Sequence, residues 1–203
     1  MNESVTLRPR FGKVLCVCVW VIMAVTAVSL IATMDVERIL RYSPGLLLIA
    51  FGAWLLFWRP AVKVEPYGVE LINLLRTRSI SWPAIQRIDT KYALTLFTSG
   101  GKFTAWAAPS PGRATLNKAT RQDLRGLPES SYGPGNTVAI GDVPTSESGA
   151  ASLLVRRQWE WLRDEGHLES GAVEGSGVKT TWHYYSAAAL VILIVAAILG
   201  ATL

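Results

Sequence analysis

The sequence predicts an α-helical membrane anchor of three transmembrane helices attached to a small α+β domain. Half of the 203 residues are hydrophobic and only 17% are charged, a composition typical of membrane proteins rather than soluble enzymes. Three apolar runs bracket one polar region. In that region short β-like stretches alternate with turn residues and precede a single amphipathic helix, a pattern that favours an antiparallel barrel or sandwich capped by a C-terminal helix.

The first apolar run, residues 14–34, follows a polar N-terminal tail at 1–13 and contains no charged residue. At 1.5 Å per residue it can cross a hydrocarbon core of about 30 Å. It is longer than the apolar core of most signal peptides, so we predict an anchor and keep a cleaved signal as the alternative. A lipoprotein signal fits less well, because Cys16 opens the run instead of ending it. Cys16 and Cys18 point about 200° apart on a helix, which excludes a shared disulfide or metal.

The second predicted span, residues 44–58, follows a short outer loop at 35–43. Its uncharged core is short for a span, but Arg41 and Arg59 extend it, because their long side chains can reach opposite interfaces. The third span, residues 184–203, is preceded by Trp182 and further ring-bearing residues that can sit at the headgroup level. Small residues recur four apart in this span, which permits close helix packing.

Positive charge predicts the orientation of these spans. The N-terminal tail has three basic residues and one acidic residue, whereas the loop at 35–43 has two of each. Arg59 and Lys63 follow the second span, and no basic residue follows the third. Because basic residues collect on the cytoplasmic side, we predict a multi-pass plasma-membrane protein. Its N-terminus and residues 59–166 would lie in the cytoplasm and its C-terminus outside.

Residues 59–166 begin with a series of predicted strands. An alternating run at 62–65 and a turn at 66–68 precede an apolar run at 69–75, in which Asn73 indicates a turn or bulge. Ser99-Gly100-Gly101 is a hairpin signal, because glycine adopts positive φ freely. The remaining predicted strands are 78–81, 85–89, 92–98 and 102–107.

A long loop rich in proline and glycine, residues 108–149, follows the strands and is interrupted by a short predicted helix at 114–124. The amphipathic helix is predicted at 148–165, with Gly166 as its C-cap. Its apolar stripe consists of Ala151, Val155, Trp159 and Leu162, and its charged residues, Arg156, Arg157, Glu160, Arg163 and Asp164, cover the remainder. Residues 167–183 are predicted to link this helix to the third span.

Several strands with hairpin turns, closed by one amphipathic helix, are the plan of a pleckstrin-homology-like (PH-like) barrel. In that plan the helix covers an open end of the barrel. Other small α+β domains fit the same pattern of elements.

A resemblance favours the PH-like plan. The segment GVELINLLRTR at 68–78, followed by Ser81-Trp82 and Ile85, is similar to the core motif of the bacterial PH-domain family of actinobacterial membrane proteins. That family includes the low-molecular-weight protein antigen 6 group. The resemblance covers 59–107 and implies a PH-like fold at the cytoplasmic face. It implies neither a biochemical activity nor lipid binding.

No arrangement of residues predicts catalysis, a cofactor or a metal site. Neither His167 nor His183 has a cysteine, carboxylate or serine at the spacing of a metal site or an activated nucleophile. Asp164-Glu165 near His167 fits a solvated helix end better than a metal site. The glycines at 100–101 lie between strands and lack the spacing of a phosphate loop. We therefore predict a non-catalytic protein without a cofactor.

Basic side chains near the membrane form the first candidate contact site. Arg76 and Arg78 share one side of an extended segment, because alternate residues of a strand point the same way. The residues predicted to gather at one end of the barrel are Arg59, Lys63, Arg76, Arg78, Arg87 and Lys91. Guanidinium pairs can hold anionic lipid headgroups, although ordinary solvated charge on a membrane-tethered domain explains the same residues.

A partner protein is the second candidate contact. PH-like domains have strand edges and a groove beside the C-terminal helix where an extended peptide can add. The Pro-rich 107–112 and the basic 113–125 form a candidate docking arm. Nucleic acid is disfavoured, because basic and aromatic residues do not interleave in one surface run. We therefore predict a bilayer-embedded scaffold for a protein of the cell envelope. An anionic-lipid sensor and an accessory subunit of a transporter or enzyme are the alternatives.

Overall fold

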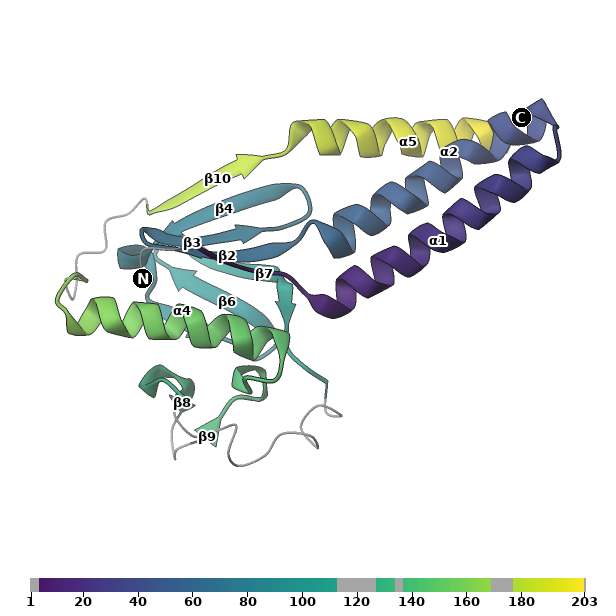
Figure 1. Cartoon of the computed structure of the whole chain (residues 1–203). Helices are drawn as coiled ribbons and strands as arrows, with labels where there is room; N and C mark the ends of the chain where they lie inside the picture. The colour runs from purple at the N-terminus through teal and green to yellow at the C-terminus, as the bar shows by residue number, and fades with distance from the viewer. Residues whose placement is uncertain (1–3, 113–126, 134–136, 169–176, 203) are drawn as a thin grey trace. The chain divides into compact units, whose positions relative to one another are not determined.

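The computed structural model describes residues 4–112, 127–133, 137–168 and 177–202. The chain divides into two compact units (Figure 1). One unit combines Met1–Arg8 with Pro60–Thr181 and contains the strands, and the other combines Pro9–Arg59 with Trp182–Leu203 and contains three long helices. The predicted helix at 114–124 lies outside the described residues.

The helical unit consists of α1 (Arg10–Ala32), α2 (Val36–Ala53) and α5 (Tyr184–Thr202). A π-helix, η1 (Trp54–Trp58), continues α2. Within the described part of the chain, three helices are long and apolar enough to cross a membrane: Arg10–Ala32, Val36–Trp58 and Tyr184–Thr202. The second of them, α2, packs against both α1 and α5.

The turn between α1 and α2 is shorter than the predicted loop at 35–43. Met34 adopts a positive φ of 53°, and Asp35 then caps α2 by accepting a hydrogen bond from the backbone N–H of Arg38 at 3.2 Å. Because this N-cap forms so early, most of the residues assigned to the loop lie in the first turns of α2.

The helices approach closely where side chains are small. A Cβ on Gly200 would lie 2.5 Å from the carbonyl oxygen of Arg41, and the Arg41 guanidinium donates to the carbonyl of Ala201 at 3.5 Å. This cation therefore satisfies a carbonyl at the C-terminal end of α5. Elsewhere in the unit, the Trp20 and Trp58 rings stack with centroids 5.8 Å apart.

The strand-containing unit has a five-stranded antiparallel sheet in the order β1-β2-β3-β4-β10. Its strands are β1 (Val5–Leu7), β2 (Ala61–Glu65), β3 (Gly68–Ile72), β4 (Arg76–Ser81) and β10 (Val178–Trp182). The central register pairs Val64 with Val69 and Val69 with Ile80, so one face of the sheet is apolar and buried.

Neither edge strand of this sheet was predicted, because β1 falls in the N-terminal tail and β10 in the linker at 167–183. β1 has three residues and β10 reads VKTTW, too short or too polar to show an alternating pattern. Each is stabilised by pairing with a neighbouring strand, β1 with β2 and β10 with β4. Ser81 of β4 donates its N–H to Gly177 at 2.8 Å, so β10 starts beside the end of β4 and runs back along it (Figure 1).

A second sheet has three antiparallel strands in the order β5-β6-β7. They are β5 (Arg87–Asp89), β6 (Ala93–Thr98) and β7 (Gly101–Pro109), and η2 (Trp82–Ala84) precedes β5. Gly101, at φ 124°, turns the predicted hairpin between β6 and β7. The register of this pair shifts between Ala93 and Thr95, which is a β-bulge or similar irregularity.

Helix α4 (Glu147–Asp164) packs on β6 and β7. Ala151 and Val155 belong to the buried core, and Trp159 and Leu162 pack against it. Ser146 caps the start of the helix by accepting from the N–H of Gly149. Between β7 and α4 the described residues form η3 (Glu129–Ser131), β8 (Tyr132–Gly133), β9 (Thr137–Val138) and η5 (Ile140–Asp142).

The fold therefore has antiparallel sheets and helices of the expected PH-like kind. The hydrogen-bonded strand order gives two separate sheets, so closure into a barrel stays a prediction. The core lies between these sheets and α4, with Leu71, Leu94 and Leu96 fully buried.

Candidate functional site

Arg76 and Arg78 lie on β4 and face the core side of the five-stranded sheet. Leu71 is the register partner of both Val62 and Arg78, and register partners point to the same face of a sheet. Arg76 lies two residues before Arg78 and shares that face. The predicted pair therefore exists, but it points toward the buried side of the sheet.

The Arg78 guanidinium stacks over the Phe103 ring of β7, with its central carbon 4.3 Å from the ring centroid. The side chain is half-buried, and among the described residues its Nε has no hydrogen-bond partner. Burial lowers the pKa of Arg78, and the positive charge of Arg76 lowers it further. Arg78 is thus a half-buried cation packed on an aromatic ring rather than a fully solvated one.

Arg87 lies on a different sheet face from Arg76 and Arg78, and Lys91 lies in a turn. Arg87 is exposed and lies 4.0 Å from the centroid of the Phe97 ring. Its register partner is Phe97, whereas the next row pairs Ile88 with Leu96 on the core side. Alternate rows point to opposite faces, so Arg87 projects away from the core. Lys91 is exposed in the turn after β5, where its N–H donates to Asp89 at 2.9 Å.

Lys63 and Arg59 complete the predicted set of basic residues. Lys63 forms an ion pair with the buried Glu65. The hydrogen bond between the two side chains raises the pKa of Lys63. Arg59 belongs to the helical unit, where it donates to Ser186 at 3.1 Å. Burial lowers the pKa of Arg59. The predicted gathering of these residues at one barrel end is therefore not observed within the strand-containing unit.

Asn73 has a role that the sequence pattern did not reveal. Its side-chain amide donates to the carbonyl of Thr104 at 3.0 Å, and its carbonyl oxygen accepts from the N–H of Trp106 at 2.9 Å. One side chain in the β3–β4 turn thereby continues the hydrogen bonding of β7, and it ties the two sheets together. The pattern indicated only a turn or bulge at this position.

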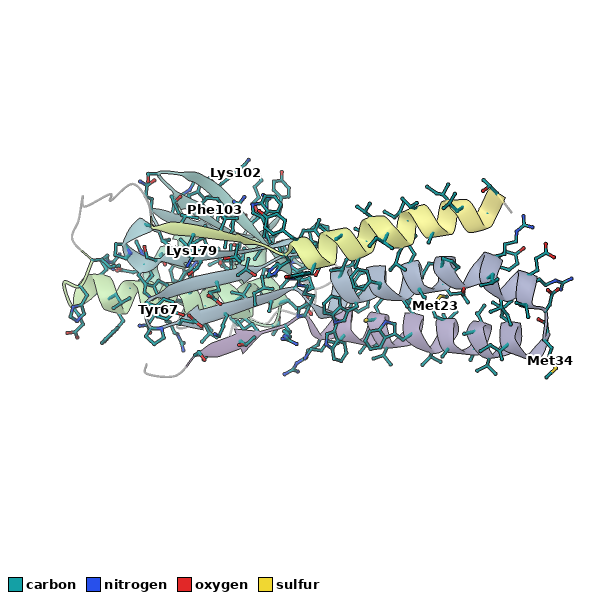
Figure 2. The ribbon with its side chains drawn as sticks, turned by 90° about the horizontal axis from the view of Figure 1, so that it is seen from above. Met23, Met34, Tyr67, Lys102, Phe103 and Lys179 are labelled. Carbon is teal, nitrogen blue, oxygen red and sulfur yellow. The ribbon has the colours of Figure 1, made fainter. Side chains whose placement is uncertain are left out.

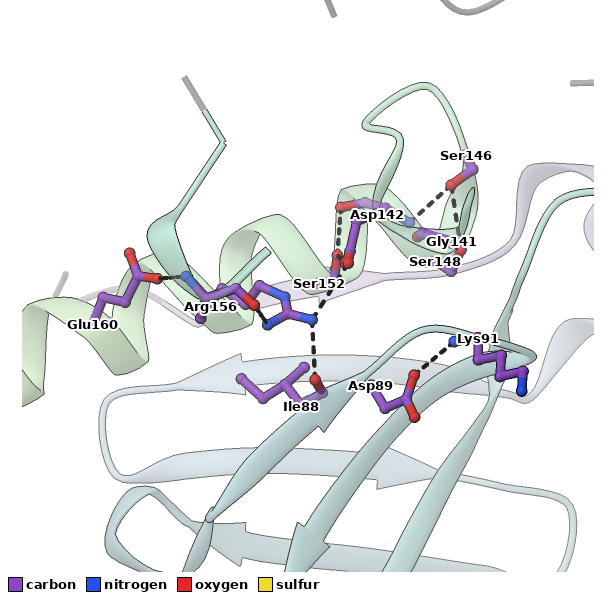
Figure 3. Close-up of polar contacts among 12 residues, drawn as sticks. Ile88, Asp89, Lys91, Gly141, Asp142, Ser146, Ser148, Ser152, Arg156 and Glu160 are labelled. Atoms are coloured by element: carbon purple, nitrogen blue, oxygen red, sulfur yellow. Dashed lines mark hydrogen bonds and ion pairs between the residues drawn. The ribbon is translucent and has the colours of Figure 1, made fainter. Parts of the chain in front are cut away.

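A buried polar cluster around Arg156 was also missed (Figure 3). Arg156 is 5% exposed. Its guanidinium donates to the carbonyl of Ile88 at 3.0 Å, to the carbonyl of Ser130 and to the Asp142 carboxylate at 3.4 Å. Ser152 donates to the other carboxylate oxygen of Asp142 at 2.8 Å. Arg156 lies outside the apolar stripe of α4 but is nevertheless buried, and a buried carboxylate and two carbonyls compensate its charge.

Residues of η3 and η5 cover one flank of α4. Glu160 accepts from the N–H of Ser130 at 2.7 Å, and Ser148 donates to the carbonyl of Gly141 at 2.8 Å. A Cβ on Gly141 would lie 2.0 Å from the carbonyl oxygen of Thr90, so η5 also presses against the end of β5. On this flank the predicted peptide groove beside the helix is already filled by η3 and η5.

One signal for this second buried flank was present in the sequence. Ser148, Ser152 and Arg156 recur at i, i+4, i+8, which aligns them along one side of a helix. Small hydroxyl residues in line with an arginine are a pattern of close, hydrogen-bonded packing. Within the described residues, no group of three or more His, Cys, Asp or Glu side chains is placed to hold a metal ion.

Comparison with known proteins agrees with this geometry. Residues 59–130 match a family model described as Bacterial PH domain, and the match includes all the strands from β2 to β7. No curated protein and no solved structure matches the chain. The actinobacterial origin and the antigen 6 group stay predictions. The two antiparallel sheets and the family match together support a bacterial PH-domain protein.

Proposed function

We propose that this chain is a non-catalytic integral membrane protein that displays its PH-like module at the cytoplasmic membrane face and there scaffolds a protein of the cell envelope. The observation that carries the proposal is the pairing of β1 with β2, which aligns Val5 with Val64 and Leu7 with Val62. α1 and α2 lie between these strands in the chain. Strands of one sheet must lie on the same side of a membrane, because the hydrocarbon core does not accommodate an open sheet.

This pairing supports a helical hairpin for the first two spans. If α1 crosses the bilayer, α2 must cross back to return β2 to the side that holds β1. β10 belongs to the same sheet, so α5 starts on that side and, by crossing, takes the C-terminus to the other side. The excess of basic residues in the N-terminal tail favours the cytoplasm for the side that holds the sheet.

Short linkers support display of the module close to the membrane. One or two residues separate a strand from its helix at three points: β1 from α1, η1 from β2 and β10 from α5. A two-residue linker spans at most about 7 Å. A module held by three such linkers has little freedom to leave the membrane surface, which is what a membrane-tethered scaffold requires.

The orientation is tested with a fused alkaline phosphatase, which is active only outside the cytoplasm. Fusion after Ser99, between β6 and β7, is expected to give no enzyme activity. A matched fusion after Met34, between α1 and α2, is expected to be active. Strong activity of the Ser99 fusion would contradict the proposed topology.

The geometry favours a protein partner over recognition of a lipid headgroup. Arg78 is half-buried and stacked on Phe103, and it faces the core side together with Arg76. A pocket for a headgroup requires several donors that converge on one phosphate, whereas Arg87 lies on the opposite face of its sheet from Phe103. Anionic-lipid sensing and an accessory role in a transporter or enzyme remain alternatives to the scaffold.

Crosslinking in living cells tests the scaffold directly. The tagged full-length chain is treated with an amine- and carboxyl-reactive crosslinker, purified and analysed by mass spectrometry. A protein partner is expected at a near-stoichiometric level. An unrelated multi-pass membrane protein with the same tag and expression level controls for capture by proximity. Recovery of lipid adducts alone would favour the lipid-sensing alternative and contradict the scaffold.

A further inference from the structure

The side of the three-stranded sheet that points away from the core is an exposed surface of mixed aromatic and basic character. The register places Arg87 beside Phe97 and Phe97 beside Lys102, and it pairs Thr95 with both Asp89 and Thr104. Neighbours in these rows share one face. The outer face is defined by Arg87, Asp89, Thr95, Phe97, Lys102 and Thr104.

The centre of the outer face is a row of cation, ring and cation across three strands. Arg87 stacks over Phe97 at 4.0 Å from the ring centroid, and Lys102 lies on the other side of Phe97 on β7. Both cations are exposed, and Lys102 lies at the outer edge of the module (Figure 2). Cβ atoms of cross-strand neighbours lie about 5 Å apart, so the Cβ atoms of Arg87 and Lys102 flank that of Phe97 at a spacing of roughly 10 Å.

The composition of the outer face indicates an acidic protein segment as its ligand. Arg87 and Lys102 give the face an excess of positive charge over its single carboxylate, Asp89, which already accepts from the N–H of Lys91. Stacking on Phe97 orients the Arg87 guanidinium and leaves its planar edge for a carboxylate. Aromatic residues and arginine are also the side chains most enriched at protein interfaces.

We propose that the outer face binds an acidic segment of a partner protein, with carboxylates on Arg87 and Lys102 and an apolar contact on Phe97. The proposal rests on the scaffold function and deepens it, because it names the surface and the chemistry of the partner.

The test places a photo-crosslinking amino acid at Thr104 of the full-length protein in living cells. Thr104 is an exposed residue of the outer face, and its replacement leaves the central row intact. We expect one protein to be captured, with the crosslinked peptide rich in Asp and Glu. Arg87→Glu with Lys102→Glu is expected to reduce the crosslink about tenfold or more, because two charge pairs become repulsive. Arg157→Glu with Lys179→Glu reverses two exposed charges elsewhere and is expected to leave it unchanged.

Several outcomes would overturn the proposal. These are phospholipid adducts, capture of a second copy of this chain, a captured peptide without acidic residues, no crosslink at all, or equal losses in the two charge-reversal variants. A second crosslinker position at Tyr67, in the β2–β3 turn and 63% exposed, separates this proposal from the scaffold function. Protein capture at Tyr67 but not at Thr104 would be consistent with the scaffold function and would contradict binding of the partner at the outer face. Capture at neither position would contradict both.

Discussion

Replacing Asp142 by alanine is expected to lower the free energy of unfolding of the module by about 3–5 kcal/mol, because it leaves the Arg156 guanidinium buried without its carboxylate. Asp142 is 2% exposed and Arg156 5% exposed, so water cannot replace the lost partner without opening the cluster. The two carbonyls that Arg156 retains, on Ile88 and Ser130, compensate only part of its charge. The measurement is denaturant unfolding of the full-length protein in detergent, followed by tryptophan fluorescence.

A double variant and a surface variant test whether the loss of stability comes from the unpaired charge of Arg156. Asp142→Ala combined with Arg156→Met removes both charges and is expected to recover most of the lost stability, because no uncompensated charge remains. Arg157→Ala, at an exposed position on the same helix, is expected to change stability by less than about 0.5 kcal/mol. A loss below about 1 kcal/mol for Asp142→Ala would mean that the pair is solvated in solution.

Gly68→Ala is expected to destabilise the module by at least about 2 kcal/mol, because the space for a Cβ is filled by backbone. A Cβ on Gly68 would lie 2.2 Å from the carbonyl oxygen of Ile80 and 3.0 Å from the Cα of Ser81. Neither atom belongs to a flexible side chain, so β3 and β4 would have to separate at the start of their shared ladder. The same unfolding measurement in detergent reads out this change.

Gly112→Ala is the matched control, because nothing lies within 4 Å of a Cβ at Gly112. It is expected to leave stability unchanged or to raise it slightly by restricting the unfolded chain. Wild-type stability of the Gly68→Ala variant would show that β3 and β4 tolerate a wider separation than the structure contains.

The elements that could be predicted from the sequence are those with a local pattern of their own. Strands β2 to β7 alternate or end at glycine and proline, and the apolar stripe of Ala151 and Val155 has the period of a helix. That Arg76 and Arg78 point to the same face also follows from strand periodicity alone. The register of β4 with β3 decides whether that face is the buried or the exposed one. This register cannot be predicted from the local sequence pattern.

The parts that could not be predicted depend on residues far apart in the chain. The sequence pattern places Arg156 only outside the apolar stripe, and its burial requires Ile88 and Asp142, which lie in other elements. β1 becomes a strand only by pairing with β2, across two helices. Asn73 likewise bonds β7, some thirty residues later in the chain. Long-range pairing decided each of these cases.

The edge positions of β1 and β10 also have a consequence for the order of folding. Among the strands of the five-stranded sheet, β1 leaves the ribosome before the others and β10 after them. β1 has no partner until β2 has been made, and the edge of β4 stays open until Val178–Trp182 follows. Such non-local pairing slows folding, and an open edge is a site for wrong association. Completion of the sheet is therefore coupled to synthesis of the segment just before α5, so the module reaches its final form only after Val178–Trp182 has been made.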